Sequence, residues 1–428
     1  MQIHVISPGD SLWRISQLYN VPVDLLVRAN QIPSPNRLVV GQSLVIPIWG
    51  RYHWVRPGES LYGISRQYNV PIAEIIRINQ IADPSQIPAG LRLYLPPAPR
   101  PTVDIAAYID PRITGEASPQ IVDSVGENLT FLNIFSYAVN RDGTLTPVID
   151  QPSIQAAYGN RVAPLMVLTN FEAGTFSTEL ATTLFTNEAL QDKVLDAAIQ
   201  IMEEKGYLGL DFDFEYLGPQ NRERYNQFLR KARTKLKEKG YFISSALAPK
   251  LSESQVGVLY EGHDYRAHGQ IVDFIFFMTY EWGWSGGPPM AVSPIDQVRK
   301  VMEYALSVVP RNKIMMGIPL YGYDWTLPYV PGGRWARSIS PQQAIALAAR
   351  YGAVIQYDPV AQAPHFNYFD EQGREHKVWF EDARSIQAKF QLVKELGIRG
   401  FFYWVLGHDF PQNWLLIQDN FIVRKRVR

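Results

Sequence analysis

The sequence contains no cysteine among its 428 residues. Disulfides therefore contribute nothing to stability, and cysteine usage does not indicate a redox compartment. Long hydrophobic runs are also missing, because none approaches the roughly 20 apolar residues that a membrane-spanning helix needs. Residues 1–8 lack the basic segment and the long apolar segment of a classical signal peptide. We therefore expect no membrane-embedded segment and no classical signal.

An excess of either charge is lacking as well. Lysine plus arginine number 41 and aspartate plus glutamate number 41, which gives a formal net charge of +0. This balance does not favour binding to nucleic acid or to an anionic membrane, and we interpret the basic residues 424–428 as a solvated tail. The seven histidines are scattered, without a spacing typical of metal ligands. We expect no metal, no cofactor and a monomeric protein.

The N-terminal part of the chain is a tandem repeat. Pro8-Gly9 matches Pro57-Gly58, and the ungapped match extends through both copies. Each copy reads strand, helix, helix, strand, which predicts two small βααβ modules at residues 1–48 and 50–97. Residues 98–101 belong to a proline-rich, semi-rigid linker. We expect this linker to separate the cores of the repeats from the rest of the protein.

Residues 102–428 show apolar, strand-like runs alternating with helical patterns. Eight such units in about 320 residues predict an α/β fold, the (β/α)8 TIM barrel. The interval between the last two strands is too long for a plain helical crossover, so residues from about 324 to 380 are predicted to form a small α+β insertion beside the cleft. The strands are predicted at residues 103–108, 129–135, 165–169, 208–215, 242–247, 272–278, 314–318 and 400–404.

The run from Tyr207 to Tyr216 is the strongest candidate for a functional site. Its Asp211, Asp213 and Glu215 alternate with apolar residues, which predicts a strand with three carboxylates on one face. Acids this close cannot all ionise, so at least one pKa must rise, and such shifts gather at functional sites. A solvated edge strand and a cation site are the alternatives. Helical patterns on both sides argue against an edge strand, and the lack of other ligand types nearby argues against a metal.

Four motifs of the barrel together resemble glycoside hydrolase family 18. Residues 208–215 read L-G-L-D-F-D-F-E, against the family's fourth-strand D-G-x-D-x-D-x-E. Residues 278–281 resemble its M-x-Y-D, residues 317–322 resemble its G-x-P-x-Y-G, and Trp404 matches its eighth-strand tryptophan. Leu208 replaces the first motif aspartate, which leaves open how Asp211 is oriented or kept protonated.

The resemblance implies a retaining, substrate-assisted mechanism, in which the acetamido group of the sugar attacks its own anomeric carbon. Glu215 would protonate the leaving oxygen and then activate water, while Asp213 would stabilise the charged intermediate. Asp211 would share a proton with Asp213. Tyr280 would hydrogen-bond the acetamido oxygen, and Trp404 would form the floor under the sugar. Further candidate substrate contacts are Glu281, Met278, Tyr108, Tyr137, Tyr321, Asn170 and Phe171.

Both repeats open with P-G-[DE]-S-L-x-x-I-S, carry a central N-Q-I and close with G-x-x-L-x-[IL]-P. These motifs resemble LysM modules, which implies binding to glycans that contain N-acetylglucosamine, such as peptidoglycan or chitin. The expected contacts lie in the loop after the first strand and in the loop before the last strand. They are Gly9, Asp10, Ser11, Asn30, Gln31 and Ile32, with Gly58, Glu59, Ser60, Asn79, Gln80 and Ile81 in the second copy.

The combination of two LysM modules with the runs at residues 135–145 and 278–289 resembles the spore cortex-lytic N-acetylglucosaminidases of Bacillus-type bacteria. That resemblance implies hydrolysis of β-1,4 bonds in peptidoglycan, and a place in the spore coat, the cortex or the cell wall. A chitinase with the same chemistry is the first alternative. A catalytically inactive glycan-binding coat protein is the second, but the intact Glu215 and Asp213 favour an enzyme. A long cleft beside the insertion favours endo action.

Overall fold

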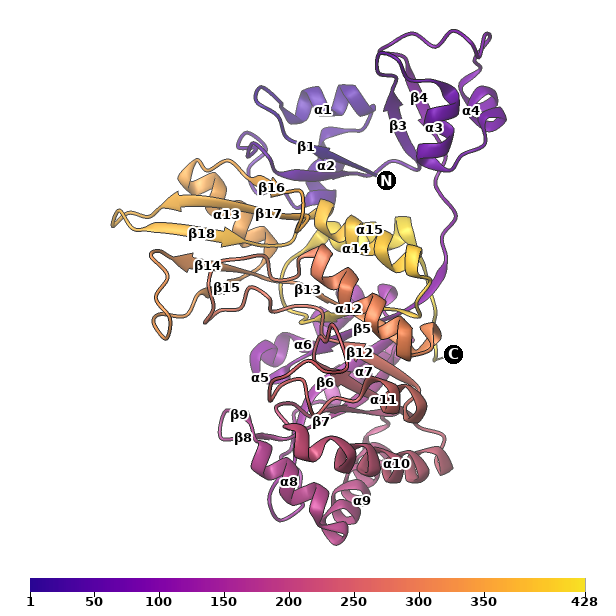
Figure 1. The fold of residues 1–428 in the computed structure, drawn as a ribbon. Coiled ribbons are helices and arrows are strands. Elements are labelled where there is room, and N and C mark those ends of the chain that lie inside the picture. The colour runs from indigo at the N-terminus through magenta and orange to yellow at the C-terminus, as the bar shows by residue number, and fades with distance from the viewer. Residues whose placement is uncertain (428) are drawn as a thin grey trace.

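The computed structural model describes residues 1–427, and its largest part is a closed parallel barrel (Figure 1). Eight strands follow one another in chain order, and the last pairs with the first to close the barrel. The predicted (β/α)8 fold is thereby confirmed. The barrel strands are β5 (Thr102–Ile109), β6 (Phe131–Ala138), β7 (Ala163–Thr169), β10 (Gly209–Asp213), β11 (Phe242–Leu247), β12 (Phe274–Phe277), β13 (Ile314–Pro319) and β19 (Gly400–Trp404).

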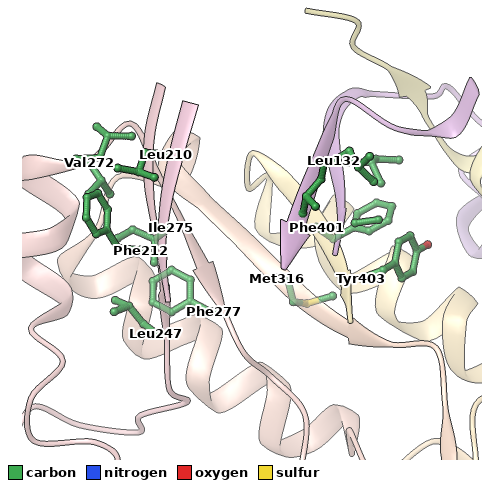
Figure 2. Packing of buried hydrophobic residues seen from close by; sticks show 14 of the residues in the cluster. Leu132, Leu210, Phe212, Leu247, Val272, Ile275, Phe277, Met316, Phe401 and Tyr403 are labelled. Atoms are coloured by element: carbon green, nitrogen blue, oxygen red, sulfur yellow. The ribbon is translucent and has the colours of Figure 1, made fainter. Parts of the chain in front are cut away.

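Helices surround the barrel, and a buried apolar layer lies between them and the strands. Figure 2 shows part of this layer, including Leu210, Phe212 and Phe277, which are fully buried. The helices around the barrel are α5 (Pro111–Thr114), α6 (Ser118–Val125), α7 (Gln151–Gly159), α8 (Thr178–Thr186), α9 (Glu188–Lys205), α10 (Arg222–Glu238), α11 (Tyr265–Ile271), α12 (Ile295–Val308), α14 (Ala383–Leu396) and α15 (Pro411–Asn420).

The end of α9 positions the acidic run along strand β10. Gly206 adopts a left-handed φ of 85°, and its N–H bonds the carbonyl of Met202, which stops the helix and turns the chain into β10. Along β10 the side chains then alternate, so that Leu210 and Phe212 join the outer apolar layer. Asp211 and Asp213 therefore point to the inside of the barrel.

The long interval between β13 and β19 forms a five-stranded antiparallel sheet with one helix, α13 (Pro341–Tyr351). The order of the strands is β15-β14-β18-β17-β16. Ala344 and Ala348 of α13 pack with Phe366 and Val378 of the sheet, which gives the insertion its own small core. Its strands are β14 (Gly322–Thr326), β15 (Arg337–Ile339), β16 (Gln356–Asp358), β17 (Ala363–Phe369) and β18 (Glu375–Trp379).

The two repeats have the same internal construction. In each copy a serine, Ser11 or Ser60, caps the first helix, and its side chain accepts a backbone N–H three residues later. Two short antiparallel strands complete each module. The first repeat comprises β1 (Gln2–Val5), α1 (Leu12–Tyr19), α2 (Val23–Asn30) and β2 (Ser43–Ile46), and the second comprises β3 (Arg51–Trp54), α3 (Leu61–Tyr68), α4 (Ile72–Asn79) and β4 (Arg92–Leu95).

The first repeat is packed against the barrel and its insertion, which corrects the expectation that the linker separates the two cores. Val39 belongs to the apolar core of the insertion, and Val45 belongs to the apolar layer around the barrel. The N–H of Ile355 donates to the carbonyl of Val40 at 2.9 Å. These contacts join residues more than 300 positions apart, so periodicity and linker composition could not reveal them. Within residues 1–427, no helix is long and apolar enough to cross a membrane.

Candidate active site

A cleft of about 590 Å³ lies at the carboxyl ends of the barrel strands, where TIM barrels place their active sites. Its lining includes acidic residues from the β10 run, aromatic residues from several strand ends, and loop residues. Most of the residues singled out in the sequence as catalytic or substrate-contacting line it directly, among them Tyr108, Asp213, Glu215, Met278, Tyr280, Glu281 and Trp404. Phe171 lines it as well.

Asp211 lies below the cleft and is held by three donors. The hydroxyl of Ser244 donates to Oδ1 at 2.7 Å, while the hydroxyl of Tyr108 and the amide of Asn133 donate to Oδ2 at 2.5 and 3.1 Å. Burial raises the pKa of Asp211 to about 6, although these hydrogen bonds favour the charged form. The replacement of the first motif acid by Leu208 thus leaves Asp211 well oriented. No hydrogen bond joins Asp211 to Asp213 within residues 1–427, and the proton that these two groups are expected to share stays a prediction.

Asp213 stands at the floor of the cleft with an unsatisfied acceptor. Its Oδ1 is buried and has no hydrogen-bond partner among the described residues. Burial, together with repulsion from Glu215 and Asp211, raises its pKa well above the usual range. An unpaired buried oxygen is costly. A ligand that donates a hydrogen bond or carries positive charge would relieve that cost.

Glu215 follows the end of β10, where the backbone is clamped by Asn170. The N–H of Glu215 donates to Asn170 Oδ1 at 3.0 Å, and Asn170 Nδ2 donates to the Glu215 carbonyl at 2.9 Å. Burial, and to a lesser degree the charge of Glu281, raises the pKa of Glu215 to about 7. Asn170 is itself buried and does not line the cleft. The expectation that Asn170 contacts substrate is therefore corrected to a positioning role.

Tyr280 and Glu281 line the cleft from the segment just after the end of β12. Gly317 makes room for Tyr280, since a Cβ at that glycine would lie 2.8 Å from the tyrosine ring. Glu281 accepts hydrogen bonds from the hydroxyls of Tyr321 and Tyr323, the latter at 2.8 Å. Tyr321 is buried behind Glu281 and does not line the cleft, so its expected role as a substrate contact is corrected to support for Glu281.

Trp404 contributes an aromatic surface to the cleft. Its ring meets those of Phe135 and Tyr108 edge-on, at centroid distances of 5.1 and 5.6 Å. Edge-on partners of this kind hold an aromatic ring in a fixed orientation, which leaves its face available to a ligand. The peptide bond after Trp404 is cis, as is the one after Phe135.

Tyr137 was expected to contact substrate, and the structure places it elsewhere. Its side chain lies in the apolar layer outside the strands, because the register of β6 shifts between Ile134 and Tyr137. Its hydroxyl donates to Asp150, which also accepts from Lys205 and Tyr207. Tyr137 thus belongs to a buried polar network between strand and helix, and its role in the site is corrected to a structural one.

Several residues that line the cleft are not predicted by the sequence motifs. Tyr216 directly follows the acidic run, and its position after a strand end was a usable signal. Tyr260 lies in the irregular segment between β11 and α11, and Trp284 in the loop after β12, where no period constrains a side chain. Tyr323 comes from the insertion. All four line the cleft.

The LysM candidates divide into structural and exposed residues. Asn30 and Asn79 bond the backbone of the last strand, which corrects their expected role as glycan contacts. Asp10 and Glu59 each bond a histidine and a backbone N–H of their own module. Ile32 is buried in the core of the first repeat, and its counterpart Ile81 packs against that of the second. Ser11 and Ser60 serve as helix caps. The exposed candidates are these two serines together with Gly9, Gly58, Gln31 and Gln80.

The chemistry of the cleft follows from two of its three carboxyl groups, those of Glu215 and Asp213. Glu215 holds its proton up to about pH 7 and faces the cleft, so it can give that proton to a ligand and take one back. Asp213 offers an unpartnered acceptor beside it. Within residues 1–427, no group of three or more histidine, cysteine, aspartate or glutamate side chains is placed to hold a metal ion.

Comparison with known proteins gives the same picture. Residues 165–409 match the model of the glycosyl hydrolases family 18, and residues 4–47 and 53–96 match the LysM domain. The chain is 55% identical over 431 residues to the cortical fragment-lytic enzyme of Bacillus subtilis, with 100% of both chains covered. It is 48% identical to that of Bacillus anthracis, again with full coverage.

The crystal structure of the Bacillus megaterium spore cortex-lytic enzyme SleL superposes with a TM-score of 0.91 at 46% identity, covering 100% of this chain and 99% of that one. Similarity of this extent includes the repeats, the barrel and the insertion in one arrangement. The chain belongs to the glycosyl hydrolases of family 18, and it is a member that carries two LysM domains ahead of its barrel.

Proposed function

We propose that this protein is an N-acetylglucosaminidase that hydrolyses β-1,4 bonds in spore cortex peptidoglycan, including fragments of it. One observation carries the proposal: the unpartnered, buried oxygen of Asp213 lies at the floor of the cleft that Glu215 lines. A substrate-assisted glycosidase needs this pairing of a proton donor with an acceptor for the acetamido group. The full-length relatives named cortical fragment-lytic enzymes support cortex as the polymer.

The residues would act in sequence on a sugar held against Trp404. Glu215 gives its proton to the leaving oxygen, while the acetamido oxygen of the substrate attacks the anomeric carbon and forms an oxazolinium ion. Asp213 accepts the acetamido N–H and stabilises the positive charge. Tyr280, which lines the cleft, orients the acetamido oxygen. Glu215, now charged, takes a proton from a water molecule. The oxygen of that water attacks the anomeric carbon, which opens the oxazolinium ring and retains the β configuration.

The LysM part of the chain and the cleft would bind the same polymer. We place the protein at the spore cortex or the cell wall, acting as a monomer. The sugar that is cleaved must be N-acetylglucosamine, because the amide of that sugar must reach its anomeric carbon. A muramic δ-lactam cannot serve there, since its amide is tied into a ring.

Product analysis tests the proposal. Purified cortex fragments and chitin are digested, the new reducing ends are labelled with borohydride, and the products are identified by mass spectrometry. We expect labelled N-acetylglucosamine from cortex, and at least about a 100-fold loss of rate in Glu215→Gln, from the usual contribution of acid–base catalysis. Labelled muramic acid would show a muramidase, and faster cleavage of chitin would show a chitinase. Near-wild-type turnover in the variant would refute the role of Glu215.

A further inference from the structure

The two repeats match in sequence but differ in their surroundings. In the first repeat, the end of the loop before the last strand, with the buried Val39 and Gly41, is covered by the insertion and by the last helices of the barrel (Figure 1), while Gln31 and residues 35–37 of the same loop are exposed. The carbonyl of Asn30 accepts from Gln342 Nε2 at 3.0 Å and from Gln412 Nε2 at 3.4 Å. The carbonyl of Gly41 accepts from Arg384 at 3.0 Å. This loop is half of the surface on which the sequence placed glycan contacts.

The corresponding loop of the second repeat is open. Val39 and Gly41 are buried, whereas their counterparts Pro88 and Gly90 are exposed. A Cβ at Gly41 would lie 1.8 Å from the carbonyl oxygen of Ile355, while one at Gly90 would meet nothing within 4 Å. Within residues 1–427, no hydrogen bond joins the loop of the second repeat to the barrel or to the insertion.

The second repeat is mounted on the first. The side chain of Gln2 bonds both the N–H and the carbonyl of Tyr52, at 2.8 and 3.1 Å. Arg92 donates to the carbonyl of Leu18 at 3.2 Å. The first repeat therefore contacts the barrel on one side and the second repeat on another, and it connects the two.

We propose that only the second repeat binds glycan, and that the first acts as a rigid mount which holds this binding surface at a fixed place relative to the cleft. The ligand is a glycan polymer that contains N-acetylglucosamine units, so the inference rests on the proposed function. An exposed aromatic ring is common to both repeats, Trp13 and Tyr62 each being 66% exposed. The difference between the repeats thus lies in the covered loop, since a sugar held between two loops needs both of them free.

This arrangement changes how the modules assist catalysis. Two tethered modules would raise retention by binding one polymer twice. Here the second repeat and the cleft are the two sites that share a strand, and their separation is fixed by packing instead of by a flexible linker. The fixed geometry raises the effective concentration of strand at the cleft only for polymers long enough to reach both.

The lack of cysteine allows a clean test. Gln31→Cys and Gln80→Cys are matched variants, because both residues are exposed and have left-handed φ of 45° and 52°. Each is made in full-length Glu215→Gln protein, so that substrate persists, and is coupled to a bulky polyethylene glycol maleimide. Retention on insoluble spore peptidoglycan is then measured. We expect the label at position 80 to lower retention at least about tenfold, as loss of a binding hot spot does, and the label at position 31 to change it little.

Equal losses from the two labels, or a greater loss at position 31, would overturn the inference while leaving glycan binding established. No retention of the unlabelled protein would overturn both the inference and the proposed binding of glycan. A second measurement reports binding locally: an environment-sensitive dye replaces the polymer label, and the N-acetylglucosamine tetramer is titrated. A saturable signal from position 80 alone supports the inference, and one from position 31 refutes it.

Discussion

At the scale of single residues, the proton on Glu215 decides when the cleft can work. Burial is the main reason that its pKa is raised to about 7, and the charge of Glu281 adds to it. A general acid must be protonated in the free enzyme, so the active form is present below that pKa and is lost as the pH rises through it. The pKa of Glu215 therefore sets the alkaline limit of activity.

The pH dependence of kcat/KM should accordingly fall above about pH 7. Glu281→Gln removes the smaller of the two causes, so the alkaline limb should move to lower pH by a fraction of a unit, since burial remains. Profiles measured on cortex fragments for wild type and variant give the comparison. An alkaline limb that stays in place, or that moves upward, would contradict the assigned coupling between these two carboxyl groups.

Asn170 is the residue whose role most needs a separate test. Asn170→Ala removes both hydrogen bonds that fix the backbone of Glu215. We expect kcat to fall by roughly 10- to 100-fold, because small displacements of a catalytic group are costly, with KM nearly unchanged. Asn187→Ala is the control, since it removes the cap of α9 at a distance from the cleft. If both variants lose kcat equally, the effect is one of general stability.

At the scale of elements, the alternation of strand-like and helical patterns was sufficient to predict the barrel. It was insufficient to predict all the residues that line the cleft. Strands such as β10 and β13 were predictable because apolar runs between helices have few other uses in a fold of this size. The acid face of β10 followed from its period of two. The register shift in β6 that carries Tyr137 to the outer layer left no such signal. Loop residues such as Tyr260 and Trp284 depend on tertiary packing, which periodicity does not encode.

The loop of the first repeat gives a matched test of docking. Gly41 and Gly90 have nearly equal φ of 85° and 86°, so alanine costs about 1–2 kcal/mol at either position for the left-handed backbone. Only at Gly41 would the new Cβ collide with the carbonyl of Ile355. Thermal unfolding of Gly41→Ala should therefore begin at a clearly lower temperature than that of Gly90→Ala. Equal midpoints would mean that this interface contributes nothing to stability.

At the scale of the whole molecule, the barrel, the insertion and the first repeat form one packed body. Val39 and Val45 extend two of the apolar clusters of the catalytic part, and the amino group of Met1 pairs with Asp419 of α15. A proline-rich linker suggests modules that can be removed without affecting the fold of the barrel. The linker at residues 98–101 joins the barrel to the second repeat, whereas the first repeat, although farther away in the sequence, packs directly against the barrel and its insertion.

Removal of residues 1–98 should therefore weaken the barrel as well as its retention on polymer. Each buried valine contributes about 1.5–3 kcal/mol, and 1 kcal/mol corresponds to about 2–4 °C in a domain of 150–250 residues, so the midpoint should fall by at least about 5 °C. Rates on short soluble fragments, which cannot reach the second repeat, should also decline, because α14 and α15 lose the cover that packs them. Calorimetry and fragment assays of the truncated and full-length proteins measure both effects. An unchanged midpoint with unchanged rates on short fragments would show that the repeats are independent of the barrel after all.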